Sequence, residues 1–468
     1  MSDNITIQDI KNELTNMYDV RYREIQCAHT IIHIVYIESM CNKDNISDYI
    51  IRPLMNHFNP RDNLDKITAE IIQASSAKQV KNVDDAVSHV ITGNVVVLFT
   101  NVNQAITCTM NGFEKRAIDI PQTETVIKGP REGFTEDIND NISAIRRKVK
   151  TTDLKIEHFF LGRQTQTSTV MIFIEGIAPE KLVRFVRQKI AGMQNEYVIY
   201  SNYLESKLRC KLTPFDTIGY TEKPDVAVSK LAEGRVVVIV DGSPFVVTAP
   251  YFFIENFQTT DDYTLNPFTA NIGRSFRWVA FLLSTFIPGI YLALITYHYK
   301  LIPTVLLYRL ALFRAGVPVP TIIELLYMIL FFQIIREAGV RLPQPIGPTL
   351  SIVGALILGE SAVASGLSSQ FTVVVVAITS IASYLIPVLY SAIFFWSIII
   401  VLLSGMIGLP GFYMGGVLFL AHLCGLTTCG YPYLFPLGTL KTFQYKDVLM
   451  RGNLDSISNT SLPKGKQK

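Results

Sequence analysis

The apolar and charged positions divide the chain into two unlike halves. Between Arg341 and Lys441 lie ninety-nine residues, of which Glu360 alone carries a formal charge, whereas about a quarter of the residues in an average soluble protein are charged. Upstream, the twenty residues of Trp278–Tyr297 include no Asp, Glu, Lys or Arg, and a helix of that length crosses a hydrocarbon core of about 30 Å. The pattern predicts a helical transmembrane domain over residues 270–440.

Further apolar segments complete this half, and they are Leu301–Phe313, Thr321–Ile335, Ile346–Ala364, Phe371–Leu403 and Met406–Leu434. The first two are short for a span, which needs about 20 apolar residues, and the first is predicted to be interfacial or re-entrant. Phe371–Leu403 is too long for one span, and Pro387 offers a break. Met406–Leu434 is expected to be interrupted near Pro410. We therefore expect five or six crossings.

Basic residues indicate the orientation of these spans. The tail, residues 441–468, contains six basic and two acidic residues, and the first thirty residues of the chain are polar and mixed in charge, unlike a signal peptide. Because basic flanks favour the cytosolic side of a membrane, we expect the N-terminal region and the tail to be cytosolic. Six crossings would satisfy both expectations.

Four buried-strand patterns occupy the N-terminal region, with amphipathic helical stretches between them. The strands are expected at Ile31–Ile37, Val95–Phe99, Val170–Ile174 and Val236–Val240.

The N-terminal region also repeats itself. Ala86–Val97 aligns without a gap onto Ala227–Val238 at an offset of 141 residues, and Tyr36–Ser39 matches Phe173–Gly176 at an offset of 137. The repeat predicts two duplicated α/β subdomains with the same strand order, residues 1–125 and 126–265, followed by a polytopic helical membrane domain. A cleft between two such lobes is a common place to bind a small molecule.

Charge and cysteine content narrow the classes of function. The chain has a net charge of +3, and eleven basic against five acidic residues after Trp278 give +6 there, so the N-terminal region carries −3. Without a basic arm or patch, nucleic acid is not an expected partner. His422, Cys424 and Cys429 are interpreted as ordinary residues of an apolar helix rather than as a metal site. Protease, hydrolase, kinase and dinucleotide motifs do not occur, so we expect a non-enzymatic protein without a cofactor.

The loop Gly129–Asp137 separates the two repeats and includes Arg131 and Glu132. It is interpreted either as a structural connection between the lobes or as an anion-binding turn. Its last residues are expected to cap a following helix. Three basic residues are predicted to be exposed on that helix: Arg146, Arg147 and Lys148.

A second group of charged residues is predicted to form the joint between the N-terminal region and the membrane domain. Asp261 and Asp262 precede the first span, and Arg235 and Asp241 flank the strand Val236–Val240. The alternative for Arg235 and Asp241 is that they are ordinary strand-end residues with local hydrogen bonds.

Within the membrane domain, Glu360 is predicted to lie near mid-bilayer, where an ionisable group normally faces a partner or water. Glu324 and Arg336 are its candidate companions. If several copies surround an axis, Glu360 would form an acidic ring of the kind that selects cations; the alternative is a protonated or capped carboxyl buried between subunits. The small faces around Gly354 and Gly359 predict contacts with another subunit.

Six short segments of the chain, taken together, resemble the A subunit of the GerA-type spore germination receptors, and the resemblance runs over about residues 30–455. They are Gly129–Asp137, Thr221–Asp225, Glu233–Arg235, Val240–Pro244, Asp261–Tyr263 and Arg336–Pro343. Asp216 and Lys223 depart from the Pro and Arg usual in the family. Ile329 and Gln333 stand where the family often has Glu, so an ion path would rely on fewer acids.

The resemblance implies a subunit of a nutrient receptor in the inner membrane of bacterial spores. It implies work with a transporter-like B subunit and a lipoprotein C subunit, contact with membrane lipid, a small nutrient germinant sensed through the complex, and a homo-oligomer. A channel-like, ion-conducting role also fits the family. Two alternatives stay open: a secondary transporter of small solutes or ions, which predicts inverted repeats, and a membrane-anchored scaffold, which needs no acids or broken helices within its spans.

Overall fold

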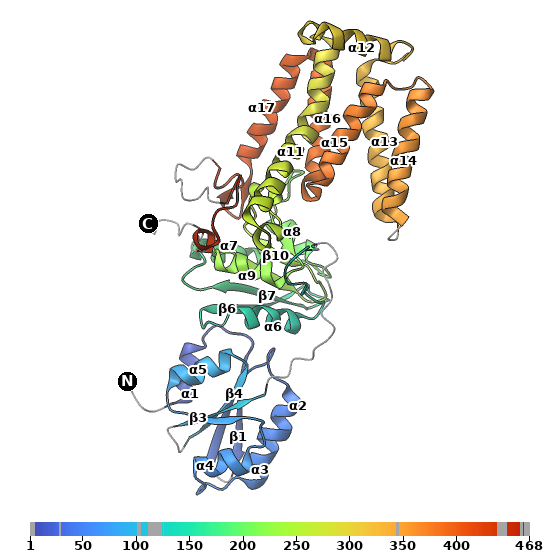
Figure 1. The fold of residues 1–468 in the computed structure, drawn as a ribbon. Helices are drawn as coiled ribbons and strands as arrows, with labels where there is room; N and C mark the ends of the chain where they lie inside the picture. Colours follow the sequence, from blue (N-terminus) through green and yellow to red (C-terminus); the bar gives the residue numbers. More distant parts are fainter. Residues whose placement is uncertain are drawn as a thin grey trace.

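Two α/β units and a helical bundle follow one another along the long axis of the molecule (Figure 1). The computed structural model describes residues 5–27, 30–100, 104–110, 124, 126–342, 346–437, 447–458 and 462. In each α/β unit, helices cover both faces of an antiparallel sheet. The bundle begins where the second unit ends, and the chain returns to the second unit after its last long helix.

The first unit is built on a five-stranded sheet with the order β1-β2-β4-β5-β3. The strands are β1 (Val20–Cys27), β2 (Thr30–Ile37), β3 (Ala77–Val80), β4 (Asn94–Phe99) and β5 (Ala105–Thr109). On one face lie α1 (Ile7–Glu13) and α5 (Val83–Ile91). The other face is covered by α2 (Lys43–Ile46), η1 (Ser47–Ile51), α3 (Arg52–His57), α4 (Leu64–Lys66) and η2 (Ile67–Ile71).

The second unit has a sheet of the order β6-β7-β9-β10-β8. The strands are β6 (Leu154–Leu161), β7 (Thr167–Ile174), β8 (Gly219–Thr221), β9 (Val236–Val240) and β10 (Val246–Ala249). On one face lie α6 (Ile138–Lys148) and α9 (Pro224–Ala232). The other face carries α7 (Glu180–Ala191) and α8 (Asn202–Leu208).

The two sheets have the same strand order once their strands are numbered within each unit, which confirms the order predicted from the repeat. The aligned segments occupy equivalent places, α5 to β4 and α9 to β9. Gly93 and Gly234 join helix to strand with φ of 88° and 90°, a conformation that glycine adopts without steric cost. Because both faces of each sheet are buried, strands such as β9 are apolar throughout rather than alternating.

The C-terminal half contains α11 (Pro267–Thr296), α13 (Thr321–Arg341), α14 (Ile346–Ala364), α15 (Gln370–Tyr384), α16 (Tyr390–Ile407) and α17 (Leu409–Gly425). These helices run side by side, and α12 (Thr304–Arg314), after η4 (Tyr299–Leu301), lies across the end far from the α/β units (Figure 1). Within the described ranges, α11 and Pro387–Ile407 are long and apolar enough to cross a membrane, with mean hydropathies of 2.0 and 2.2. Shorter apolar helices are Val353–Ala364, Gln370–Tyr384 and Leu409–Gly425.

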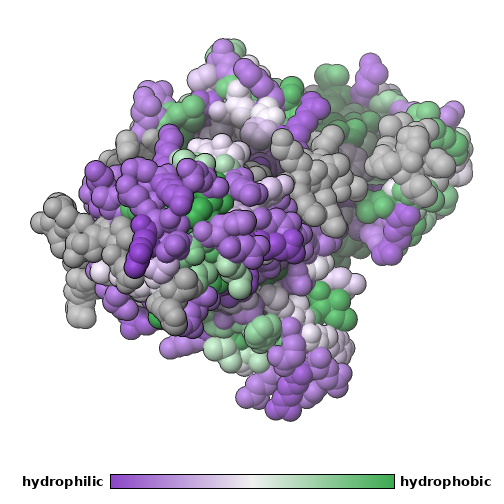
Figure 2. All heavy atoms as spheres, turned by 90° about the horizontal axis from the view of Figure 1, so that it is seen from below, coloured by the Kyte–Doolittle hydropathy of each residue, from purple (hydrophilic) through white to green (hydrophobic). Residues whose placement is uncertain are grey.

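Helix boundaries in this half partly follow the predicted ones. The break predicted at Pro387 is confirmed, because η5 (Pro387–Leu389) separates α15 from α16. The prediction of a short segment at Thr321–Ile335 is wrong, because α13 continues beyond Ile335 to Arg341 and has 21 residues. The interruption expected near Pro410 lies at Gly408, whose φ of 76° ends α16. Seen from the α/β end, the near surface is mainly hydrophilic, and hydrophobic residues are frequent where the helices extend beyond it (Figure 2).

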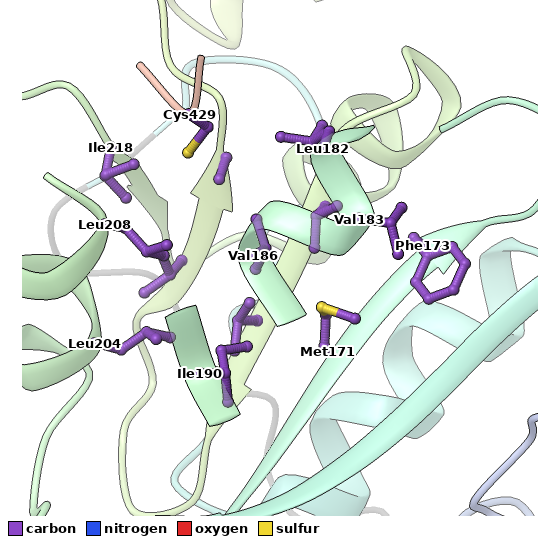
Figure 3. Close-up of a cluster of buried hydrophobic side chains, with 14 of the residues drawn as sticks. Met171, Phe173, Leu182, Val183, Val186, Ile190, Leu204, Leu208, Ile218 and Cys429 are labelled. Atoms are coloured by element: carbon purple, nitrogen blue, oxygen red, sulfur yellow. The ribbon is translucent and has the colours of Figure 1, made fainter. Parts of the chain in front are cut away.

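The segment after α17 returns to the second α/β unit, a contact that was not predicted from the basic tail. It forms the short strands β11 (Thr427–Thr428) and β12 (Tyr431–Pro432) and, later, α18 (Leu454–Ser458). Cys429, Val448 and Leu462 join the core of the second unit. In Figure 3, Cys429 is at the top of the view, between the labelled side chains of Ile218 and Leu182. Five of the six basic residues of the tail lie outside the described residues.

Candidate coupling site

The connection from the second α/β unit to α11 carries a buried ionic cluster. Asp262, in α10 (Asp261–Thr264), is 3% exposed. Its carboxylate lies 3.0 Å from Arg274 Nη2 and 2.5 Å from Arg277 Nη2, both in the first turns of α11. The backbone N–H and the hydroxyl of Thr259 donate to the same carboxylate at 3.3 and 3.2 Å. One carboxylate thus compensates two buried guanidinium groups, which would otherwise be costly to desolvate.

The segment after α17 closes this cluster from the other side. Asp447 accepts hydrogen bonds from Arg274 Nη1 and from the Tyr263 hydroxyl, each at 2.6 Å, and Gln258 donates to its carbonyl oxygen at 2.7 Å. Burial, and then the adjacent Asp447 carboxylate, raises the pKa of Tyr263 well above its ordinary value of 10. The phenol therefore stays a donor at neutral pH.

Arg451 completes the cluster by binding backbone oxygens. Its Nη1 donates to the carbonyl oxygens of Asp262 and Leu265 at 2.8 and 3.0 Å. Residues that precede α11, belong to α11 and follow α17 therefore meet at one point. We call Asp262, Tyr263, Arg274, Arg277, Asp447 and Arg451 the joint cluster.

A second ionic group ties the sheet of the second unit to the same connection. Arg235 precedes β9, and its Nη1 lies 2.5 Å from Glu255 Oε1, in η3 (Phe253–Phe257), and donates to the Pro250 carbonyl oxygen at 2.9 Å. Lys230 Nζ lies 2.8 Å from Glu255 Oε2. Burial alone would raise the pKa of Glu255, but the charges of Arg235 and Lys230 outweigh it and hold the pKa below 4.5. All of these partners lie within 20 residues of Arg235, as the strand-end alternative expected, and the coupling role of Arg235 stays a prediction.

Aromatic side chains fill the space between the connection and the base of the helices. Phe257 stacks on Trp278 with ring centroids 3.7 Å apart, and Phe253 meets Phe281 at 5.7 Å. Phe215, from the loop after α8, is 1% exposed and lies 6.2 Å from Phe419 of α17. The second unit and the bundle therefore share a continuous apolar core, through which a displacement of one would be transmitted to the other.

The other predicted coupling residues have separate local roles. Asp241 follows β9 at the end opposite Arg235 and accepts a hydrogen bond at 3.3 Å from the N–H of Ile138, the first residue of α6 and 103 residues away in the chain. Asp261 accepts one from the Ile127 N–H at 3.0 Å. Arg131 is exposed, and Glu132 pairs with Arg147 and, at 3.2 Å, with Lys148. The loop thus braces α6 as a structural connection.

Arg146 corrects the expectation of an exposed basic row on α6. It is fully buried, and its Nε and Nη2 donate to the two oxygens of Asp19 at 3.0 and 2.9 Å. Because Asp19 belongs to the first unit, this bidentate pair fastens the two α/β units together. The N-cap predicted before the helix is confirmed at Asp137, which accepts from the Asn139 and Asp140 N–H groups.

A shallow, solvent-open groove of about 620 Å³ lies next to this contact and is lined by both units. Tyr18 stacks on His158 with ring centroids 4.1 Å apart, and Arg187 forms a bidentate pair with Glu157. Burial, and then the charge of Arg21, lowers the pKa of His158 below its ordinary value of 6.5. The predicted inter-lobe cleft therefore exists, with aromatic walls and charged groups of both signs.

The candidate residues within the bundle do not come together. Glu360 is exposed on α14, whereas Glu324 is fully buried and accepts hydrogen bonds from Ser368 and Ser369. Arg336 lies against the ring of Tyr384, 5.0 Å from its centroid, and against that of Tyr390. Glu324 and Arg336 are thus not companions of Glu360 within one chain.

The glycines Gly354 and Gly359 of α14 pack against neighbouring helices of the same chain, and the contact with another subunit stays a prediction. A Cβ atom at Gly359 would lie 3.4 Å from Val373 Cγ1 of α15, and one at Gly354 would lie 3.8 Å from Ile335 Cγ2 of α13. The outward face of α14 instead carries Leu356, 69% exposed, together with Glu360.

Comparison with known proteins places this architecture in a family. The family model "Bacillus/Clostridium GerA spore germination protein" matches residues 8–461. Spore germination protein KA of Bacillus subtilis is 35% identical over 453 residues, which cover 95% of this chain and 83% of that protein. Spore germination protein GerLA of Bacillus cereus is 31% identical, with coverages of 95% and 92%. The solved N-terminal domain of the A subunit of the Bacillus megaterium spore germinant receptor GerK3 is 28% identical and covers 53% of this chain and 94% of that domain, with a TM-score of 0.42. The chain belongs to the GerA family of spore germination proteins.

Proposed function

We propose that the chain is the A subunit of a spore germinant receptor and that it passes a nutrient signal from its α/β units to its helices through the joint cluster. The full-length similarity to spore germination proteins carries this proposal. We further propose that six helices cross the spore membrane, that the α/β units lie on its cytosolic side, and that the chain assembles with B and C subunits. Both ends of the bundle meet at the joint cluster, as an even number of crossings requires.

Deletion of the gene is the direct test. Spores that lack the protein should fail to release dipicolinate in response to at least one nutrient to which wild-type spores respond, and the intact gene should restore that response. Unchanged release with every nutrient that acts on the wild type would refute the receptor role. A membrane-anchored scaffold would tolerate a loosened joint cluster, so variants of Asp262 separate it from a transducing subunit.

A channel-like role is the finer form of the proposal, and Glu360 supports it. In one chain this carboxylate is exposed on α14 beside apolar residues, so copies arranged around an axis would bring equivalent carboxylates together. Glu360→Ala should slow nutrient-triggered potassium release without loss of the protein from the membrane, and Glu360→Gln should report the effect of the charge alone. Normal potassium release from both variants would remove Glu360 from the ion path.

A further inference from the structure

Glu324 is a buried carboxylate whose charge is incompletely compensated. It lies one turn into α13 and is 0% exposed. Oε1 accepts hydrogen bonds from the Ser369 N–H at 2.6 Å and from the Ser368 hydroxyl at 3.0 Å, at the start of α15. Oε2 is buried and has no hydrogen-bond partner among the described residues. Within the same residues, no Lys, Arg or His forms an ion pair with it.

The N-terminus of α15 compensates only part of this charge. A helix N-terminus is equivalent to roughly half a positive charge, and it acts on the Oε1 side, where the Ser369 N–H donates. A proton on Oε2 would neutralise the carboxyl but would create a buried O–H donor with no acceptor in the described structure, which is itself unfavourable. A cation next to Oε2 removes both difficulties.

A row of hydroxyl groups begins at Ser369, the residue whose N–H donates to Glu324 Oε1. Ser369 Oγ lies 3.0 Å from Thr372 Oγ1, and Thr372 Oγ1 lies 2.9 Å from the Tyr291 hydroxyl of α11. A set made only of hydroxyl oxygens and one carboxylate suits a hard cation rather than a transition metal. A single carboxylate balances a single positive charge.

We propose that Glu324 and these hydroxyl groups hold one alkali cation, Na⁺ or K⁺, between α11, α13 and α15. The site goes beyond the receptor role, because it is a property of the bundle and needs no nutrient. A cation there would link α11, which begins at the joint cluster, to the two helices that pack beside it. Since the unfolded chain would not retain the site, the cation should stabilise the folded protein.

The test uses the purified full-length protein, exchanged into choline chloride and then titrated with NaCl or KCl at constant ionic strength. The wild type should show a saturable rise of several degrees in Tm with at least one alkali salt. Glu324→Gln keeps an acceptor for Ser369 but removes the charge, so it should abolish the rise, and Thr372→Val should move its midpoint to higher salt. Glu337→Gln, which changes an exposed carboxylate of α13 that pairs with Arg341, should leave the rise unchanged.

Equal Tm in choline, sodium and potassium for the wild type would overturn the proposal, and a dependence on pH alone would show that Glu324 takes only a proton. A full alkali response in Glu324→Gln would also overturn it. If Glu324→Gln does not fold, the midpoint shift in Thr372→Val decides, and an unchanged midpoint contradicts the site. Neither result depends on spores: normal alkali binding in a protein whose deletion leaves germination intact would refute the receptor role alone.

Discussion

Replacing Asp262 with Ala removes the carboxylate that both Arg274 and Arg277 contact. Breaking a buried ion pair by removing one partner costs about 3–5 kcal/mol, because the remaining charge stays desolvated. Arg274 retains Asp447 at 2.6 Å, and Arg277 retains the Thr259 hydroxyl at 2.7 Å. The loss should therefore lie near the lower end of that range, about 3 kcal/mol, a large part of the roughly 5–15 kcal/mol that stabilises a protein.

The matched control is the neighbouring carboxylate, Asp261, whose side chain accepts one described hydrogen bond, from the Ile127 N–H. Asp261→Ala should cost only about 0.5–1.5 kcal/mol. Thermal unfolding of the purified protein measures both losses, and nutrient-triggered dipicolinate release measures coupling, with immunoblots to show that the variants accumulate. We expect Asp262→Ala to delay release much more than Asp261→Ala.

An Asp447→Ala variant tests whether the joint cluster acts as a unit. Asp447 and Asp262 both contact Arg274, so their effects on unfolding should be non-additive, as they are for residues in one network. Additive losses would show that the segment after α17 packs against the joint cluster without being energetically coupled to it. Wild-type dipicolinate release from Asp262→Ala spores with normal protein levels would refute the coupling role altogether.

Three further predictions concern the α/β units. Asp19→Ala should destabilise them by about 3–5 kcal/mol in urea unfolding because it leaves Arg146 buried without its partner, whereas the double variant Asp19→Leu/Arg146→Met should recover most of the loss. The lowered pKa of Glu255 means that its stabilisation is fully present above pH 4.5 and is lost as the pH falls through the folded-state value; Glu255→Gln should remove that part of the acid dependence of Tm. Gly242→Ala, at φ 79° in open space, should cost about 1–2 kcal/mol. Gly234→Ala should cost more, because its φ is 90° and a backbone oxygen would lie 2.9 Å from the new Cβ; equal losses would contradict the steric argument.

The shared strand order of the two sheets could be predicted from the sequence repeat, because the repeated strands are recognisable locally. Val95–Phe99 and Val236–Val240 are uninterrupted apolar runs, and each begins two residues after a glycine. Both features can be recognised in a single sequence without knowledge of distant partners. The pairing of β3 and β8 at the far edge was not predictable in this way. Those strands have four and three residues, too few for a periodic pattern.

The joint cluster was only half predictable, because its residues come from distant parts of the chain. Asp261 and Asp262 stand before a long apolar helix, so their place at the start of the helical bundle follows from the sequence. Asp447 and Arg451 lie more than 170 residues further along, in a polar segment that resembles an unstructured tail. Arg146 was misplaced on the same ground, because its partner Asp19 is 127 residues away. Local patterns indicate which residues are charged, but long-range packing decides which charges are buried.

The return of the chain after α17 limits how the helices can respond to the α/β units. Arg274 in the first long helix and Asp447 after the last one share a hydrogen bond. Phe215 of the second unit lies against Phe419 of α17 and against Phe253, which in turn meets Phe281 of α11. A displacement of the second unit therefore acts on both ends of the bundle together. Helix α14, which carries the exposed Glu360, packs against α13 and α15, and both of these helices contact α11. A signal that enters at the joint cluster would therefore pass from α11 through α13 or α15 before it reached that surface, so packing within the bundle, rather than the joint alone, would set how strongly nutrient and helices are coupled.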